Sequence, residues 1–460
     1  MPHPLSLAPI APDALHTLWR LARPLLPALA WACMHGPALA QAPTHRPLDG
    51  LQLACGEEPP PALTGRYSIG AGGDAPPADK LAALGRKVFF DPGLSASGRQ
   101  SCASCHNPSH AYGPANALPV QKGGPDMKAT GFRNTPALRY LHGPFAFTEH
   151  YVDLADGKQE GGPAGGRTWD GRVNLAHEQA LMPLLDAKEM ANRSLSEVVA
   201  RVRKAPYAKE FDELLSPPGS HILDDEEGVI SWLTSAIEFF EQSVEDFHPF
   251  TSKYDAYRKG RVELTAAELR GLKLFSNKDK ANCATCHPLT PISAAMPFPR
   301  FTDFEYMALG VPRNRAIAAN RDPSFFDLGL CGPLRKDLSD QAGYCGRFRT
   351  PTLRNVALRR SFFHNGVFHS LHDVLDFYAT RDTHPERWYG KDRQGRVVRY
   401  DDLPPAYRAN VNQDAPFKPM PDGRPRLNAQ DIRDLEAFLR TLTDGYVPPP
   451  VKLIMRNASR

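Results

Sequence analysis

Two short stretches, "CASCH" at residues 102–106 and "CATCH" at residues 283–287, carry the clearest chemistry in this sequence. Each places two cysteines three positions apart and a histidine directly after them. Two thiols at this spacing can add to the two vinyl groups of haem, and the adjacent histidine can bind the haem iron. A disulfide redox pair would favour a βαβ context, and a zinc site would need more ligands nearby. Two matches therefore predict two covalently bound haem c groups.

Each haem is expected to take three residues from its own stretch: Cys102, Cys105 and His106 for haem 1, and Cys283, Cys286 and His287 for haem 2. The group opposite each histidine decides the function, because an iron with two strong protein ligands transfers electrons, whereas an iron with one can bind peroxide. One candidate is Tyr378, in "FHSLHDVLDFYATRD". Its helical spacing from Leu371 directs it to an apolar face, where a tyrosine taken alone is more often part of a core than a ligand.

Amphipathic helices are the elements that must position these residues. "SLSEVVARV" and "TAAELRGLKLF" each begin with a capping box, Ser194 with Glu197 and Thr265 with Glu268. "DEEGVISWLTSAIEFFEQSV" and "NAQDIRDLEAFLRTL" repeat apolar residues at helical spacing. The sequence contains no convincing strand alternation or hairpin signal. The predicted fold class is therefore mainly α.

An internal repeat suggests how the chain is divided. "LGRKVFFDPGLSASGRQSCASCH" and "LRGLKLFSNKDKANCATCH" each place a glycine-containing helix before a polar loop and a CxxCH unit. This repeat predicts two cytochrome c-like haem domains with long loops, an N-terminal one over residues 76–250 and a C-terminal one over residues 251–425. Residues 426–460 are expected to form a helix and tail that pack back on the N-terminal domain.

Length, charge and the N-terminal residues indicate the number of domains and the cellular compartment of the protein. A length of 460 residues favours two domains, and a net charge of +4 without long runs of like charge excludes a nucleic-acid partner. Arg20 and Arg23 precede an apolar stretch that ends in "ALAQ", so residues 1–40 read as a signal peptide with cleavage after Ala40, a membrane anchor being the alternative. Residues 41–75 are rich in proline and glycine and predict a flexible leader. We expect a periplasmic protein without a membrane span in its mature form.

Four of the eight cysteines remain after the CxxCH units are assigned. Cys331 and Cys345 bracket "CGPLRKDLSDQAGYC" and could close a disulfide, which an oxidising compartment permits. Cys33 would leave with the signal peptide. Cys55 then has no partner and no assigned role.

Several further motifs give a family resemblance that runs from about residue 76 to residue 445. "TWDGRVNLAHEQALMPLLDAKEM", "FRNTPAL", "FRTPTLRNVAL" and "FFHNGVFHSLHDVLDFY", together with the two CxxCH units, resemble the bacterial di-haem cytochrome c peroxidases and their MauG-like relatives. "DLGLCGPLRKDL", "YCGRF" and "FYATRDTHPERWYG" further resemble the MbnH-type branch of the MauG-like proteins. The resemblance implies that haem 1 is the peroxidatic haem and haem 2 the electron-transfer haem.

For haem 2, the resemblance implies that Tyr378 is the second iron ligand. Peroxidases of the family place a methionine at this position, and MauG places a tyrosine. A hard, anionic phenolate favours ferric iron, whereas a soft thioether favours ferrous iron. Met307 and Met296 are competing candidates for the same coordination position.

For haem 1, the resemblance implies a distal pocket built by Gln179, Pro183 and Glu189, with the glutamate moving a proton during O–O cleavage. Typical peroxidases carry a displaceable distal histidine just before the first Arg-Asn segment. Here that stretch reads "VQKGGPDMKATGFRN" and contains no histidine. Met127 could substitute, but an open sixth position is favoured. His110, His142 and His150, in the flanking loops, are expected at the surface.

Two more features follow from the resemblance. Trp169 takes the position between the haems, where an indole can relay oxidising equivalents. Asn134, with the backbone carbonyls of Arg359 and Ser361, takes the position of a calcium ion between the haems.

The function implied is a periplasmic di-haem c oxidoreductase, an enzyme of the peroxidase class. It would use hydrogen peroxide to form a high-valent, bis-ferryl-type state and oxidise a partner protein at long range, the expected target being a tryptophan of a copper-binding protein. Trp388 is a candidate relay toward that partner. The alternatives are a peroxidase that takes electrons from a small c-type cytochrome and a non-enzymatic di-haem electron carrier.

Overall fold

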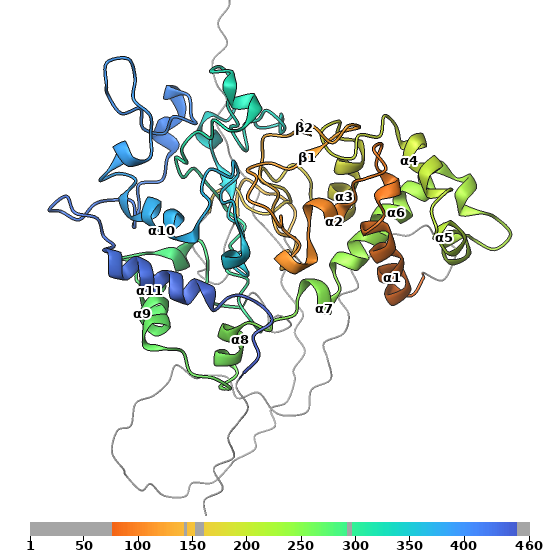
Figure 1. Ribbon diagram of the computed structural model, residues 1–460, viewed down its shortest axis with the longest axis horizontal. Helices are drawn as coiled ribbons and strands as arrows, with labels where there is room; N and C mark the ends of the chain where they lie inside the picture. The colour runs from red at the N-terminus through yellow and green to blue at the C-terminus, as the bar shows by residue number, and fades with distance from the viewer. Residues whose placement is uncertain (1–75, 142–144, 152–160, 292–296, 449–460) are drawn as a thin grey trace, which may run out of the picture. The chain divides into compact units, whose positions relative to one another are not determined.

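The computed structural model describes residues 76–141, 145–151, 161–291 and 297–448. This part of the chain is mainly helical, as predicted (Figure 1). Its helices are α1 (Ala78–Phe89), α2 (Cys102–Cys105), α3 (Ala176–Leu185), α4 (Leu195–Val202), α5 (Ala208–Leu215), α6 (Glu226–Glu241), α7 (Val244–Phe247), α8 (Lys253–Arg258), α9 (Ala266–Ser276), α10 (Leu371–Thr380) and α11 (Ala429–Arg440). The predicted signal peptide, the leader, Cys33 and Cys55 lie outside the described residues, as do His142 and Met296.

The sheet content of the described residues is small. β1 (Lys122–Gly123) pairs antiparallel with β2 (Ala129–Thr130), and β3 (Tyr306–Met307) pairs antiparallel with β4 (Phe348–Arg349). In the second pair Tyr306 lies opposite Arg349. Within the described ranges, no helix combines the length and the apolar character needed to cross a bilayer.

The predicted helix starts are confirmed by their capping contacts. The hydroxyl of Ser194 accepts the backbone N–H of Glu197 at 3.2 Å at the start of α4. At the start of α9, the hydroxyl of Thr265 accepts the N–H of Glu268 at 3.3 Å, and the Glu268 carboxylate accepts the N–H of Thr265 in return. Such caps satisfy N–H groups that have no partner within the helix, and each contributes about 1 kcal/mol.

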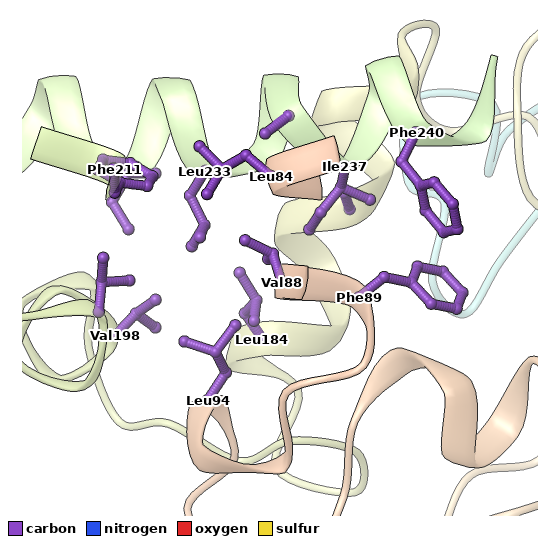
Figure 2. Packing of buried hydrophobic residues seen from close by; sticks show 14 of the residues in the cluster. Leu84, Val88, Phe89, Leu94, Leu184, Val198, Phe211, Leu233, Ile237 and Phe240 are labelled. Carbon is purple, nitrogen blue, oxygen red and sulfur yellow. The ribbon is translucent and has the colours of Figure 1, made fainter. Parts of the chain in front are cut away.

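The buried apolar side chains form two large clusters. The first joins α1, α3, α4, α5 and α6 within residues 81–247 (Figure 2). Leu84 and Val88 of α1 point toward Ile237 of α6 in this cluster, and the rings of Phe89 and Phe240 meet edge to face at 5.4 Å. The second cluster joins α9, α10 and α11 within residues 254–442. The two predicted haem domains thus each contain a core of their own.

A glycine in each repeat explains the tight helix crossings. A Cβ atom at Gly85 of α1 would lie 1.8 Å from the backbone oxygen of Ala236 in α6. Likewise, a Cβ atom at Gly271 of α9 would lie 1.9 Å from the backbone oxygen of Asp434 in α11. Only a residue without a side chain fits either crossing. The helix before each CxxCH unit therefore packs in the same way on a partner helix, α6 in the first repeat and α11 in the second.

This correspondence corrects one expectation about the C-terminus. α11 packs against α9 and α10, in the core of the C-terminal half, and not on the N-terminal domain (Figure 1). The reason is that α11 is the counterpart of α6, so the second repeat needs it to complete its own core. The segment after α11 contacts the other half: the Asp444 carboxylate accepts hydrogen bonds from Tyr140 at 2.7 Å and Arg139 at 3.2 Å.

The disulfide that the sequence allowed between Cys331 and Cys345 is present. Cys331 and Cys345 are bonded to each other, and both are buried. The bond closes the loop that precedes β4.

Candidate active site

The first CxxCH unit lines a cavity in the N-terminal half. Cys102 and Cys105 are free thiols at the two ends of α2, one helical turn apart, and His106 follows them into the same cavity. The His106 ring donates from Nδ1 to the Tyr112 carbonyl at 3.0 Å. Burial lowers the pKa of His106 to about 4, so the imidazole is neutral and its Nε2 lone pair is left for a metal.

The second CxxCH unit repeats this arrangement in the C-terminal half. Cys283 and Cys286 are free thiols that line a second cavity with His287. The His287 ring donates from Nδ1 to the Phe301 carbonyl at 2.8 Å, and burial lowers its pKa to about 4. Two thiols and one histidine held in this tautomer fit a covalently attached haem in each cavity.

Tyr378 lines the same cavity as His287. Its ring stacks on Phe417 with centroids 4.9 Å apart and on Phe363 at 6.1 Å, so its direction is set by aromatic contacts. Its hydroxyl has no hydrogen bond to any residue in the described ranges. Burial raises the pKa of Tyr378, and the nearby Arg381 guanidinium opposes that rise. The side chain is therefore oriented and available as a ligand on the cavity side.

The competing methionine is also near. Met307 lines this cavity, and its sulfur accepts a hydrogen bond from the Asn412 amide at 3.9 Å. Met307 thus stays a candidate ligand, although its sulfur already has a donor. His110 lines this cavity too, whereas we expected it at the surface.

The predicted acid–base residues meet around the first cavity. Gln179 and Pro183 lie one turn apart on α3, and Glu189 follows in the turn after that helix; all three line the cavity with His106. The backbone of Glu189 is held at both ends, because its N–H donates to the Asp186 carbonyl at 2.9 Å and its carbonyl accepts from Gly124 at 2.8 Å. Glu189 is an exposed residue that borders the open cavity.

The pKa of Glu189 suits proton transfer. Burial and the Asp186 charge raise it, Arg172 opposes both effects, and the resulting pKa is about 7. A carboxyl with a pKa near neutrality can both accept and return a proton at physiological pH. Gln179 can hydrogen-bond a small ligand beside it through its amide.

In the described part of the chain, neither a second histidine nor Met127 lines the cavity of His106. His106 is the single histidine among the described residues that line its cavity. Met127 does not line it, and lies instead in a turn in which its N–H donates to the Gly124 carbonyl at 3.1 Å. Gln179 and Glu189 line the cavity of His106, whereas Met127 does not.

Trp169 lines both cavities. Its indole N–H donates to the Asn134 carbonyl at 2.7 Å, and its own carbonyl accepts the N–H of Arg349 at 2.9 Å. The next residue, Asp170, is fully buried and bonded to Thr168 Oγ1 and Arg133, each at 2.6 Å. A rigid hydrogen-bonded frame therefore holds the indole between the two cavities.

The groups predicted to bind calcium do not form a calcium site. The Asn134 amide nitrogen donates to the Ser361 carbonyl at 3.1 Å, and the Arg359 guanidinium donates to the same carbonyl at 3.1 Å. One of the three intended ligands is thus already bonded to two donors, one of them positively charged. A calcium ion needs six to eight oxygen ligands that point at one place.

Sequence reasoning missed two groups that line the first cavity, Glu241 and Arg349. Glu241, at the end of α6, has its pKa raised to about 7 by burial, against the lowering effect of Arg167. Arg349 lines both cavities, and burial lowers its pKa. Cations such as Arg349 that have no ion pair among the described residues fit the carboxylates of haem propionates. The sequence feature that could have identified Glu241 is its position as a charged residue at the end of the apolar face of α6.

Comparison with known proteins agrees with this geometry. Residues 79–263 match the family described as Di-haem cytochrome c peroxidase. The chain is 34% identical over 383 residues to the methylamine utilization protein MauG of Paracoccus denitrificans, covering 81% of this chain and 91% of that protein. The diheme peroxidase BthA of Burkholderia thailandensis superposes with a TM-score of 0.69 at 41% identity, over 79% of this chain and 86% of that chain. A MauG-like protein associated with microbial copper homeostasis superposes with a TM-score of 0.55 at 26% identity, over 83% and 96%.

Proposed function

The chain belongs to the di-haem cytochrome c peroxidase and MauG family, and on that premise we propose that it is a periplasmic oxidoreductase in which the two haem c groups do different work. The observation that carries this proposal is the asymmetry of the two cavities. The cavity of His106 contains an acid and an amide, Glu189 and Gln179, whereas the cavity of His287 contains a phenol, Tyr378. The disulfide between Cys331 and Cys345 supports an oxidising compartment.

The first cavity is the proposed site of peroxide reduction. Bound haem supplies the redox chemistry there, in which hydrogen peroxide, two protons and two electrons become two water molecules. Glu189 takes the proton from the near oxygen of peroxide and delivers it to the far oxygen, which leaves as water. Gln179 orients the peroxide by hydrogen bonding, and Pro183 shapes the wall one turn further along α3.

The second cavity is the proposed store for oxidising equivalents. Tyr378 would supply an oxygen ligand to a haem held by His287, and a phenolate is best suited to iron in its higher oxidation states. Trp169 is the proposed relay, because it lines both cavities and its indole N–H is anchored on Asn134.

We propose a partner protein as the reductant, with a tryptophan of a copper-binding protein as the target. One similar structure supports a link to copper, because it is described as a MauG-like protein associated with microbial copper homeostasis. A series of aromatic side chains joins Tyr378 to Trp388, the candidate relay toward that partner. Phe377 lies 6.2 Å from Tyr378 and 5.7 Å from Trp388, whose half-buried ring contacts the edge of the second core.

A cytochrome-linked peroxidase is the second candidate function. It is favoured by the 41% identity to a protein described as a diheme peroxidase, which exceeds the 26% identity to the copper-associated neighbour. Steady peroxide turnover with a reduced small c-type cytochrome would favour this candidate. Oxidation of one tryptophan in a copper-binding periplasmic protein would favour the first.

The spectrum of the ferric two-haem protein tests the asymmetry itself. We expect one high-spin and one low-spin haem by electron paramagnetic resonance, and a Tyr378→Phe variant that changes only the low-spin signal. A Met307→Leu variant is the matched control, because it removes the competing ligand from the same cavity and should leave that signal unchanged. Two low-spin haems in the wild-type protein would indicate an electron carrier instead.

A further inference from the structure

The segment between the two cavities already contains a cation of its own. Arg359 follows the short helical turn Val356–Leu358, and its half-buried side chain lines the cavity of His287. Its Nε donates to the Ser361 carbonyl at 3.1 Å, and its Nη2 donates to the Thr135 carbonyl at 3.0 Å. Its charge also reaches the other cavity, since it contributes to lowering the pKa of His106.

The orientation of Asn134 agrees with a site built around this guanidinium. Its amide nitrogen donates to the carbonyls of Ser361 and Phe363, at 3.1 and 3.2 Å, and its amide oxygen accepts the Ser361 hydroxyl at 3.2 Å. This placement of the amide nitrogen and oxygen satisfies all three contacts. The nitrogen, and not the oxygen, therefore faces the carbonyls that a metal ion would need to share with it.

The charge of Arg359 is not neutralised by a carboxylate in the described part of the chain. Burial lowers its pKa to about 10, which leaves it protonated at neutral pH. The carbonyl oxygens of Ser361 and Thr135 are the groups that stabilise it. Carbonyl oxygens are also the ligands that calcium prefers, so a guanidinium bonded to them and a calcium ion exclude each other by contact and by charge.

We propose that the Arg359 guanidinium is the resident cation between the two haem cavities and that the protein binds no calcium there. Its hydrogen bonds, in place of a metal ion, join residues 134–135 to residues 359–361. The link is covalently part of the chain, so chelators cannot remove it. This inference goes beyond the proposed function and does not depend on which reductant the protein uses.

Metal analysis of the purified two-haem protein is the first test. After dialysis against excess CaCl₂ and removal of free metal, we expect far less than one calcium per chain. The melting temperature and the ferric spectrum should be the same in CaCl₂ and in EGTA. One calcium per chain, released by EGTA with a change in the spectrum, would overturn the proposal.

Substitution of the arginine is the second test. Arg359→Thr removes the guanidinium from the carbonyls of Ser361 and Thr135 and leaves the Asn134 amide as the remaining donor to Ser361, so the variant should bind calcium about 100-fold or more tightly than the wild type in equilibrium dialysis. CaCl₂ should then raise its melting temperature. Arg359→Lys keeps the charge and should remain indifferent to calcium, as should the matched control Arg360→Thr, which alters the exposed neighbour.

Two outcomes would overturn this part. One is a folded Arg359→Thr variant that binds no more calcium than the wild type. The other is that Arg359→Lys or the wild type needs bound calcium for its stability or its spectrum. This second outcome contradicts the proposal even if the threonine variant does not fold.

Discussion

The proton chemistry assigned to Glu189 predicts a specific pH dependence. As a base, the carboxyl must be ionised before peroxide reacts. Burial, with help from Asp186, raises its pKa to about 7. The ionised fraction then rises from about one tenth at pH 6 to about nine tenths at pH 8, so the rate constant for peroxide should rise about tenfold over this interval. Stopped-flow mixing of the ferric two-haem protein with peroxide measures this rate constant directly.

Two neighbours of Glu189 make the sign of the effect testable. Asp186 raises the pKa of Glu189 and Arg172 lowers it. Asp186→Asn should therefore move the midpoint of the pH profile to lower pH, and its side-chain oxygen can still accept the Lys188 N–H that Asp186 accepts at 2.7 Å. Arg172→Gln should move the midpoint to higher pH. Shifts in the opposite directions would contradict the electrostatic account.

Replacing Glu189 by glutamine tests how much its carboxyl contributes to the rate of reaction with peroxide. Glu189→Gln keeps the size of the side chain but cannot take a proton, so the peroxide rate should fall roughly 100- to 10,000-fold and lose its dependence on pH near 7. Glu213→Gln, on the exposed face of α5, is the control and should react like the wild type. A Glu189→Gln rate close to the wild-type rate, or a wild-type rate that is flat across neutral pH, would refute the role of Glu189.

Three further predictions concern the relay, its frame and the disulfide. Trp169→Phe should leave the rate of peroxide binding unchanged but slow the spectral change at haem 2 in rapid-mixing experiments, because Trp169 lines both cavities. Asp170→Asn should lower the free energy of unfolding in urea by about 3–5 kcal/mol, since it breaks a buried ion pair with Arg133, and an unchanged midpoint would contradict the frame. The pKa of Asp170 is lowered in the folded state, so its stabilising effect should be lost as pH falls through that lowered value, which acid titration of the wild type would detect. Replacing Cys331 and Cys345 together by serine should cost about 3 kcal/mol, given the 14-residue separation of the bonded cysteines, and equal urea midpoints for the two proteins would rule this out.

Local signals in the sequence were enough to predict the haem attachment sites and the helices. A CxxCH unit contains its whole reactive group within five residues, and the caps at Ser194 and Thr265 act on N–H groups three residues away. The pairing of Cys331 with Cys345 is also local, within one loop. Such features need no knowledge of distant parts of the chain, and the structure confirms the caps, the helices and the disulfide.

Properties that depend on distant segments were decided only by the tertiary structure. The pKa of Glu189 depends on the burial and on the charge of Arg172, and the place of Trp169 depends on Asn134, 35 residues earlier. Arg359 meets the Thr135 carbonyl across 224 residues, so no spacing rule could reveal this contact. The packing of α11 on α9 likewise depends on a backbone approach at Gly271. Sequence by itself determined which groups could react; the fold determined their charge, their neighbours and their division between two cavities, because these are set by contacts between residues far apart in the chain.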